Sequence, residues 1–284
     1  MQPLNSIAIV GVGLIGGSIG LAVRKRGLAK QVVGIGRSSE RLAQARDLAA
    51  IDRGTVNLAE GVQDADLVVV CTPVASIVQR VQEASSAAPP HAVLTDAGST
   101  KREIVTQLDS TVSSSLPGPQ YVGSHPLAGD HRTGCEFARA DLFENRVTVI
   151  TPTSHTSRAA TSTVTEFWQA LGSRVVEMSP EAHDQALAIT SHLPHLVASA
   201  MSATTPGEYL PLTAGGWQDT TRLAAADPEL WRQIFAANRA AVVEAVERFD
   251  MSLAALREAL RTGDDQRLLQ LLQEAKQVRD ALGN

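Results

Sequence analysis

The sequence predicts a doubly wound, mostly parallel α/β sheet followed by an all-α domain. Over residues 1–178, short apolar runs alternate with helical patterns, as is typical of βαβ units around a parallel sheet. Over residues 179–284 the strand signals disappear and long amphipathic stretches replace them. We therefore place a domain boundary near Met178, with one domain over 1–178 and a second over 179–284.

Short runs rich in β-branched and other apolar residues predict the strands of the first domain. They are Ser6–Val10, Gln31–Ile35, Leu67–Cys71, Ala92–Thr95, Gln120–Gly123 and Val147–Thr151. The helical patterns between them cover Ile15–Arg26, Ser39–Leu48, Val74–Ser85 and Lys101–Leu108. A helix over Ser157–Leu171 and a strand over Val175–Met178 complete the expected sheet.

The second domain is expected to consist of long helices. Amphipathic patterns cover Pro180–Thr204, Leu230–Arg261 and Asp264–Leu282. Between the first two, Thr204–Gly216 is rich in proline and glycine, which predicts a loop.

Composition narrows the range of partners. The chain of 284 residues has a net charge of −5 and no basic patch, which argues against nucleic acid or an anionic membrane. The two cysteines, Cys71 and Cys135, do not suggest a disulfide framework and fit a reducing cytoplasm. The apolar stretch Ile7–Val23 approaches the length of a membrane span, but its glycines favour a buried strand turning into a helix.

A glycine pattern follows the first predicted strand directly and opens the first helix. Gly11, Gly13 and Gly16 form Gly-x-Gly-x-x-Gly, with Leu14 and Ile15 in the last gap. The first glycine permits a tight turn, the second lets a pyrophosphate approach, and the third lets helix and strand pack closely. The helix N-terminus then offers free N–H groups to the phosphates. The sequence therefore predicts a Rossmann domain that binds a nicotinamide dinucleotide.

The end of the second strand bears on which dinucleotide is bound. Sites that prefer NAD usually carry a carboxylate there for the ribose 2′-hydroxyl. Here the strand is followed by Gly36, Arg37, Ser38 and Ser39. Arg37 can clamp a 2′-phosphate, and either serine can donate to it. These residues favour NADP, and NAD stays possible.

Three polar segments follow predicted strands, at the edge where ligands bind in open α/β sheets. They are Cys71-Thr72-Pro73, Asp96–Lys101 and Ser124–Gly129. We expect the first segment to contact the cofactor. In the third segment, His125 is well suited to be a general base because the ordinary pKa of histidine lies near working pH. A nearby serine can orient its imidazole.

The helical domain adds further polar motifs. They are His183-Asp184, Ser191–His195 and Gly215–Arg222. We considered a zinc site made of His183, His192 and His195, but neither a His-Glu-x-x-His pattern nor cysteine ligands accompany these histidines. We therefore expect no metal, and structural or hydrogen-bonding roles for His183 and His192.

Taken together, these motifs resemble the prephenate/arogenate dehydrogenase family of tyrosine biosynthesis. The resemblance covers the chain from the first strand to about Phe249. It depends on the order Gly-x-Gly-x-x-Gly, Cys-Thr-Pro, Asp-x-x-Ser-x-Lys, His-Pro-x-Ala-Gly, His-Asp, Ser-His-Leu-Pro-His, Asp-Thr-Thr-Arg and Asp-Pro-x-x-Trp. Related β-hydroxyacid and 6-phosphogluconate dehydrogenases use a lysine on the first long helix after the sheet, and Pro180–Thr204 has none.

The resemblance implies oxidative decarboxylation of a cyclohexadienol, with hydride transfer to the nicotinamide and loss of carbon dioxide. It implies that His125 assists deprotonation of the ring hydroxyl and that Ser99 is its hydrogen-bonding partner. It also implies that His195 and Arg222 contact the substrate and that Trp231 reaches a neighbouring subunit's site. The helical half would be a dimerisation domain, which gives a homodimer.

Two departures from the family pattern bear on the substrate. Asp130 follows Ala128-Gly129 where the family usually has threonine, and Gln218 stands where it often has a basic residue. An added anion and a lost cation both favour L-arogenate, which carries an ammonium group, so we expect a single-function, NADP-dependent arogenate dehydrogenase giving L-tyrosine. The alternatives are a prephenate dehydrogenase giving 4-hydroxyphenylpyruvate and a dinucleotide-sensing protein without turnover.

Overall fold

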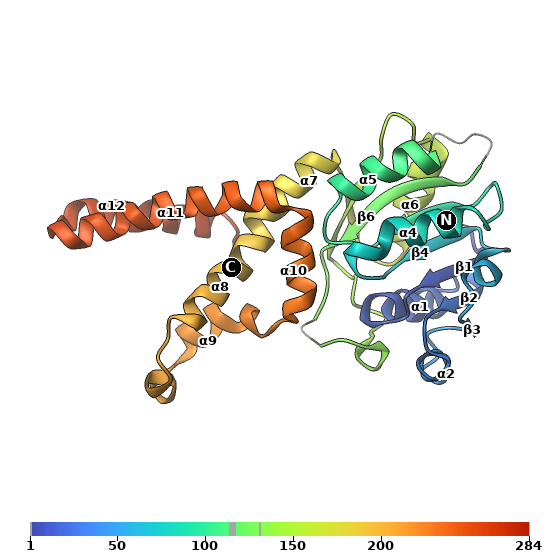
Figure 1. Cartoon of the computed structure of the whole chain (residues 1–284), viewed down its shortest axis with the longest axis horizontal. Coiled ribbons are helices and arrows are strands. Elements are labelled where there is room, and N and C mark those ends of the chain that lie inside the picture. Colours follow the sequence, from blue (N-terminus) through green and yellow to red (C-terminus); the bar gives the residue numbers. More distant parts are fainter. Residues whose placement is uncertain (1, 114–117, 131, 284) are drawn as a thin grey trace. The chain divides into compact units, whose positions relative to one another are not determined.

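The computed structural model describes residues 2–113, 118–130 and 132–283 (Figure 1). The chain divides into two compact units, Met1–Asn238 and Arg239–Asn284. The first unit therefore contains the sheet together with the first helices of the predicted helical half. The boundary near Met178, inferred from the change in sequence pattern, stays a prediction.

The sheet of the described residues has eight strands in the order β3-β2-β1-β4-β5-β6-β7-β8. Their bounds are β1 Leu4–Val10, β2 Ala29–Ile35, β3 Arg53–Thr55, β4 Leu67–Val70, β5 Val93–Asp96, β6 Gln120–Pro126, β7 Val147–Thr151 and β8 Arg174–Glu177. Neighbours pair in parallel except β6 and β7, which are antiparallel. From β1 the chain winds outward in both directions, so the predicted doubly wound, mostly parallel sheet is confirmed.

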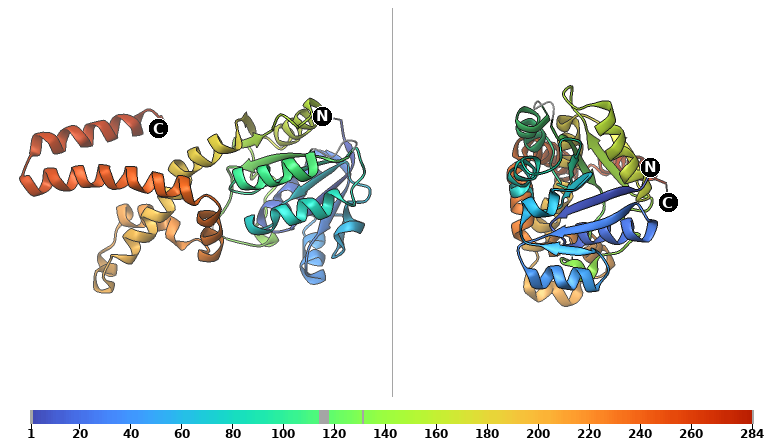
Figure 2. Two further views of the ribbon diagram at one scale, coloured as in Figure 1. Left: turned by 45° about the horizontal axis from the view of Figure 1, so that its top comes forward. Right: turned by 90° about the vertical axis from the view of Figure 1, so that its right-hand side faces the viewer.

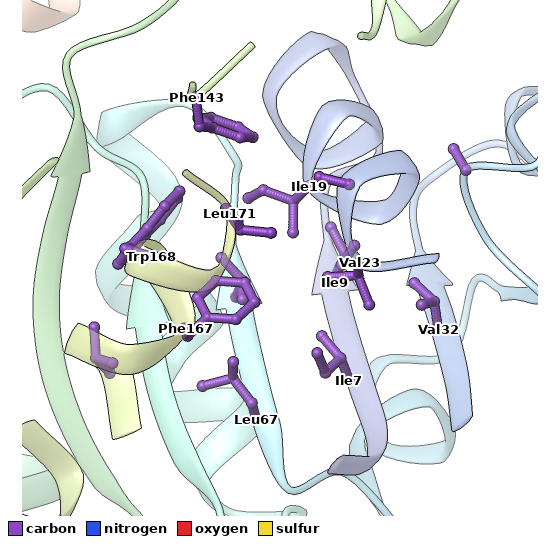
Figure 3. Packing of buried hydrophobic residues seen from close by; sticks show 14 of the residues in the cluster. Ile7, Ile9, Ile19, Val23, Val32, Leu67, Phe143, Phe167, Trp168 and Leu171 are labelled. Carbon is purple, nitrogen blue, oxygen red and sulfur yellow. The ribbon is translucent and has the colours of Figure 1, made fainter. Parts of the chain in front are cut away.

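Helices cover both faces of this sheet. They are α1 Leu14–Arg26, α2 Ser39–Asp47, α3 Leu58–Val62, α4 Val74–Ser85, α5 Arg102–Leu108 and α6 Arg158–Ala170. Alternate residues of β1 serve the two faces, as the pleat of a strand requires. Ile7 and Ile9 pack with side chains of α1 and α6, including Ile19 and Trp168 (Figure 3). Ala8 and Val10 belong to the other core, beneath α3, α4 and α5.

Two elements of the sheet region were not predicted. Strand β3 has only three residues, Arg53-Gly54-Thr55, and α3 has five. Neither is long enough to show a hydrophobic period. Asn57 begins α3 by accepting the Glu60 N–H with its side chain (3.3 Å), a capping signal that could have located the helix.

Beyond β8 the first unit becomes helical (Figure 2). The elements are α7 Pro180–Leu187, a π-helical turn Ala188–His192, α8 Leu193–Ala203, α9 Gly215–Thr221 and α10 Pro228–Ala237. The expected loop before α9 holds one 3₁₀ turn, Gly207–Leu212.

The stretch Leu230–Arg261 is helical, as predicted, but it is divided into two helices, because α10 ends at Ala237 and α11 begins at Arg239. Asn238 separates them, at a φ of −115°. Its side-chain amide nitrogen lies 2.7 Å from the Asp184 carbonyl oxygen and 3.2 Å from His192 Nδ1. These hydrogen bonds to α7 and the π-helical turn account for an interruption that helical periodicity could not reveal.

The second unit is a pair of helices, α11 Arg239–Thr262 and α12 Asp265–Asp280. Gly263, with a φ of +69°, makes the turn between them, and Asp264 begins α12 by accepting the Arg267 N–H (2.9 Å). Several apolar side chains of this unit are exposed: Val243, Met251, Leu253, Leu260, Leu269, Leu272, Val278 and Leu282. None of the described helices of the chain combines the length and apolar character of a membrane span.

Candidate active site

The loop after β1 is shaped by two glycines. Gly11 has a φ of +95°, a conformation that side chains rarely allow, and a Cβ there would lie 2.9 Å from the Cys71 carbonyl oxygen. A Cβ on Gly16 would lie 2.1 Å from the Gly11 carbonyl oxygen. Any larger residue at either position would push α1 away from the sheet. The loop and the start of α1 therefore lie against the ends of β1 and β4.

The same loop forms a cradle for an anionic group. Nothing lies within 4 Å of a Cβ built on Gly13, and no side chain caps the N-terminus of α1, whose first residues are Leu14 and Ile15. The first N–H groups of the helix are thus available to phosphate oxygens. Beside the loop, the buried Thr72 hydroxyl has no hydrogen-bond partner among the described residues. These features fit a dinucleotide.

Cys71, Thr72 and Pro73 follow β4 at this edge, as the sequence predicted from the strand order. Burial and the nearby Asp96 carboxylate raise the pKa of the Cys71 thiol, so this cysteine stays protonated near neutral pH. Its place beside the glycine loop thus reflects packing rather than nucleophilic chemistry.

The end of β2 presents the residues that bear on cofactor choice. Arg37 is exposed and has no ion pair among the described residues. The Ser38 hydroxyl oxygen accepts the Arg41 N–H (3.3 Å) at the start of α2, which leaves its own hydrogen available for donation. Ser39 is exposed in the first turn of α2. The region is polar and carries two cations, Arg37 before α2 and Arg41 in its first turn, on either side of Glu40.

His125 lies near the end of β6, at the same edge as the glycine loop. Its Nδ1 lies 2.9 Å from Nε2 of His183, on α7. Nδ1 of His183 in turn lies 2.7 Å from Oδ1 of Asp184. Asp184 also accepts two backbone hydrogen bonds, from Lys101 N–H at Oδ1 (2.7 Å) and from Arg102 N–H at Oδ2 (3.0 Å). His125, His183 and Asp184 thus form a hydrogen-bonded relay, with the half-buried His125 at its outer end and Asp184 anchored at the start of α5.

Burial and hydrogen bonding determine the charges of these three side chains. Burial lowers the pKa of His125 well below its usual value, and the neighbouring His183, Lys101 and His192 lower it further. Burial also lowers the pKa of His183, against the opposing hydrogen bond to Asp184. Burial alone would raise the pKa of Asp184, but the hydrogen bonds from His183 and the two backbone N–H groups hold it below its usual value. Near neutral pH the two histidines are therefore neutral and Asp184 is a carboxylate.

A buried ion pair fixes the loop between β5 and α5. The Asp96 carboxylate pairs with the Lys101 ammonium, and both side chains are fully buried. The same carboxylate accepts hydrogen bonds from Tyr121 Oη (2.7 Å), Ser124 N–H (3.0 Å) and Gly98 N–H (2.8 Å). A buried charge is stable only when its partners are satisfied in this way. The ion pair therefore holds the loop firmly beside β6.

This loop carries Ser99, which the family resemblance gave as the partner of His125. Among the described residues no hydrogen bond joins Ser99 to His125, whose Nδ1 pairs with His183 instead. The neighbouring Thr100 hydroxyl is buried and has no partner among the described residues. The role of Ser99 stays a prediction.

A second group of rings lies on α8 and α10. The His195 and Trp231 rings stack, with centroids 3.4 Å apart and planes 22° from parallel. Burial lowers the pKa of His195 to about 4, against a backbone hydrogen bond to Leu223, and the charge of Arg222 lowers it further. His195 is therefore neutral near neutral pH and lies near the exposed Arg222. Trp231 thus stacks on His195 of its own chain, and its reach to a neighbouring subunit's site stays a prediction.

The surroundings of Asp130 change the electrostatic argument about the substrate. The Arg132 side chain holds this carboxylate through two hydrogen bonds, from Nε to Oδ1 (3.0 Å) and from Nη2 to Oδ2 (2.6 Å), and the Arg132 N–H also donates to Oδ1 (3.1 Å). Asp130 was expected to add a negative charge, but the adjacent guanidinium compensates that charge. Gln218, the other departure, is exposed on α9.

The roles of several residues here were not predicted. His183 was expected to have only a structural or hydrogen-bonding role, and Asp184 was given no role, although the His-Asp motif was recognised. The contact between His125 and His183 spans 58 positions, which periodicity and strand order cannot reveal. The motif Asp96–Lys101 did contain a signal for the buried ion pair, because its acidic and basic residues flank a turn. Among the described residues, no cluster of three or more His, Cys, Asp or Glu side chains could hold a metal ion.

Comparison with known proteins gives the same family for both halves of the chain. Residues 19–177 match the family model described as prephenate dehydrogenase, nucleotide-binding domain, and residues 179–274 match that described as prephenate dehydrogenase, dimerization domain. The prephenate dehydrogenase of Bacillus subtilis is 34% identical, over 99% of this chain and 77% of its own.

Solved structures agree with this assignment. That of the Aquifex aeolicus prephenate dehydrogenase in complex with hydroxyphenyl propionate and NAD⁺ superposes with a TM-score of 0.90, at 32% identity over 99% of both chains. That of the Synechocystis arogenate dehydrogenase does so with a TM-score of 0.83, at 27% identity over 98% of this chain and 99% of that one. The site, the two family models and these relatives agree, and the chain belongs to the prephenate/arogenate dehydrogenase family of oxidoreductases.

Proposed function

We propose that this protein catalyses the oxidative decarboxylation of a cyclohexadienol carboxylate. The observation that carries the proposal is the neutral His125 at the edge of the sheet that also bears the dinucleotide cradle. A ring hydroxyl hydrogen-bonded to His125 would present its carbon to a cofactor held by the glycine loop. Arg222 and His195 supply a cation and a neutral hydrogen-bonding ring beside one another for the substrate's carboxylate and side chain.

In the proposed mechanism, His125 accepts the proton of the ring hydroxyl. A bound nicotinamide dinucleotide supplies the hydride acceptor for the carbon that bears this hydroxyl. Arg222 holds a carboxylate of the substrate, which fixes the ring relative to His125. The ring carboxylate leaves as carbon dioxide, and its bonding electrons make the ring an aromatic phenolate, which takes the proton back from His125. The protein therefore chiefly has to orient the reactants and hold one proton during the reaction.

For the cofactor we propose NADP. Support comes from Arg37, an exposed cation at the end of β2 that has no ion pair among the described residues, and from the neighbouring serines. NAD is the alternative, because the Aquifex aeolicus relative was solved with NAD⁺.

Arg37→Ala tests the cofactor proposal. We expect the KM for NADP to rise about tenfold or more and the KM for NAD to change little, as the loss of a charge-assisted hydrogen bond predicts. Arg41→Ala, in the first turn of α2, is the matched control. Equal effects of Arg37→Ala on both cofactors would exclude a contact with the 2′-phosphate.

For the substrate we propose L-arogenate, which would give L-tyrosine. The remaining support is the neutral Gln218, because Arg132 compensates the charge of Asp130. Prephenate is the second candidate, favoured by that compensation and by the names of the Bacillus subtilis and Aquifex aeolicus relatives. The Synechocystis relative is named an arogenate dehydrogenase.

We further propose that the protein acts as a homodimer in the cytoplasm. The exposed apolar side chains of α11 and α12 are typical of a surface that a second subunit buries. The family model over residues 179–274 is named a dimerization domain. Both cysteines are free thiols, as is usual for a reducing compartment. We propose neither a nucleic acid nor a membrane as a partner.

The deciding experiment is a two-by-two assay of the purified protein. NAD or NADP is combined with arogenate or prephenate, and formation of the reduced nicotinamide is followed. Turnover of arogenate with NADP is the expected result. Turnover with prephenate or NAD instead would keep the reaction and correct its specificity. No turnover in any combination, with dinucleotide binding intact, would favour the dinucleotide-sensing alternative.

A further inference from the structure

The direction of each hydrogen bond between Asp184 and His125 can be assigned. Both Asp184 oxygens accept backbone N–H groups, from Lys101 and Arg102, so this carboxyl group is an acceptor at each end. The 2.7 Å contact with His183 must therefore have its hydrogen on His183 Nδ1. A neutral imidazole with its hydrogen on Nδ1 is an acceptor at Nε2. His183 thus offers His125 a lone pair.

The assignment continues to the outer ring. His125 Nδ1 lies 2.9 Å from His183 Nε2 and must supply the hydrogen of that contact. A neutral His125 with its hydrogen on Nδ1 carries its free lone pair on Nε2. Without His183, either nitrogen of His125 could bear the hydrogen, and in one of the two forms Nε2 could not accept a proton.

We propose that His183 and Asp184 are positioning residues that fix His125 in the tautomer whose Nε2 is the free base. This inference rests on the proposed function, because it takes His125 to be the group that receives the hydroxyl proton. Once that proton is on Nε2, the imidazolium keeps its Nδ1 hydrogen bond to His183. The Asp184 carboxylate then lies one ring away from the new positive charge and stabilises it.

The rest of the structure explains how the pair can hold its geometry. Asp184 and its neighbour in the chain, His183, are both buried on α7. The carboxylate is fixed from the α5 side by two N–H groups, and the Asp184 carbonyl oxygen accepts from the Asn238 amide (2.7 Å). The buried His183 ring is held at both nitrogens, by Asp184 at Nδ1 and by His125 at Nε2. The tautomer of His125 is therefore set by elements other than its own strand.

Two substitutions at His183 test the proposal through turnover. His183→Leu removes the acceptor and should lower kcat ~10²-fold or more, because part of His125 takes the wrong tautomer. The KM for the ring acid and the Kd for the dinucleotide should stay within about threefold, since neither ligand is bound by His183. His183→Gln restores an oxygen acceptor toward His125 and should return kcat to within about tenfold of the natural protein.

These variants give clear contrary results. A kcat of His183→Leu within about threefold of the natural value would overturn the proposal. Equal losses in the Leu and Gln variants would also overturn it, because they would show that the ring matters for packing alone. Dinucleotide binding and the thermal midpoint of each variant, measured alongside, show whether the chain is folded.

A spectroscopic test needs no turnover and so separates this proposal from the proposed function. The chain has seven histidines, and ¹⁵N-histidine labelling with comparison to His125→Asn identifies the His125 signals. At neutral pH the natural protein should show a protonated Nδ1 and an unprotonated Nε2, and His183→Leu should shift this distribution. The opposite tautomer in the natural protein would refute the relay even if the enzyme is active. An inactive protein with the expected tautomer would instead refute only the proposed function.

Discussion

His125 and His195 are both neutral near neutral pH, but the protein holds them in different ways. His125 is connected edge to edge through His183 to Asp184. The His195 ring lies face to face with the Trp231 ring, and its hydrogen bond among the described residues is with the backbone of Leu223. A hydrogen bond selects one ring nitrogen, whereas stacking fixes the plane of a ring without deciding where its hydrogen lies. The hydrogen-bonded arrangement of His125 suits proton transfer, and the stacked arrangement of His195 suits binding of the substrate.

The largest expected effect tests the proton-transfer side of this comparison. His125→Asn should reduce kcat ~10²–10⁴-fold, the usual range for the loss of a general base, and leave the Kd for the dinucleotide nearly unchanged. Steady-state kinetics and a binding titration measure the two quantities. His91→Asn is the control, because His91 is exposed and contacts only Asp66 among the described residues. Full activity of the His125 variant would mean that another group is the base.

A smaller effect concerns His192, which lies between the two arrangements. Burial lowers its pKa to about 4, from an ordinary value of 6.5. Because the folded pKa is the lower one, the unfolded chain binds the proton first as pH falls. Stability is therefore full above about pH 6.5 and is lost progressively down to about pH 4. From about pH 7 to about pH 5, His192 alone should reduce the free energy of unfolding by about 2 kcal/mol.

Urea unfolding at these two pH values measures this loss. His192→Gln removes the titrating ring, so the difference between the two pH values should shrink by about the same amount. His125, His183 and His195 also have lowered pKa values and contribute in the same direction, so some pH dependence should persist. An unchanged difference in the Gln variant would show that His192 does not titrate in this range.

The smallest expected effect tests the stacked arrangement. Trp231→Ala removes the face that supports His195 and should raise the KM for the ring acid about two- to tenfold, as the energy of one aromatic pair suggests. The kcat should change less, because the relay to His125 is untouched. Trp231→Phe keeps an aromatic face and should restore most of the affinity. A fall in kcat that exceeds the rise in KM would contradict the division between recognition and proton transfer.

The sequence predicted the parts of the fold that local patterns determine. β1 was recognisable because Ile7, Ala8, Ile9 and Val10 are uniformly apolar, as a strand buried on both faces requires. The glycine loop was recognisable because its spacing is tied to a strand and a helix. β3 was missed because three residues carry no period, and the break at Asn238 was missed because tertiary hydrogen bonds cause it.

For the candidate site, the ends of the predicted strands located the residues, but the sequence could not predict which side chains pair with one another. His125 could be found because it lies near the end of a strand, at the ligand-binding edge. Its pairing with His183 depends on how α7 packs, and the pairing of Asp130 with Arg132 depends on the conformation of one loop. A sequence gives the identity of such residues but not which of their charges are already compensated.

The antiparallel pairing of β6 with β7 has a consequence for how this enzyme can change. β6 continues beyond the end of β5, and there Gly123–Pro126 pair with β7, with His125 opposite Val149. The Leu127 N–H donates to the Val147 carbonyl oxygen (2.8 Å), so the N–H that Pro126 lacks would have pointed away from β7. His125, the proposed base, thus belongs to an intact ladder rather than to a loop. If His125 is the base, we expect evolution toward another ring acid to leave this ladder unchanged and to alter other segments instead.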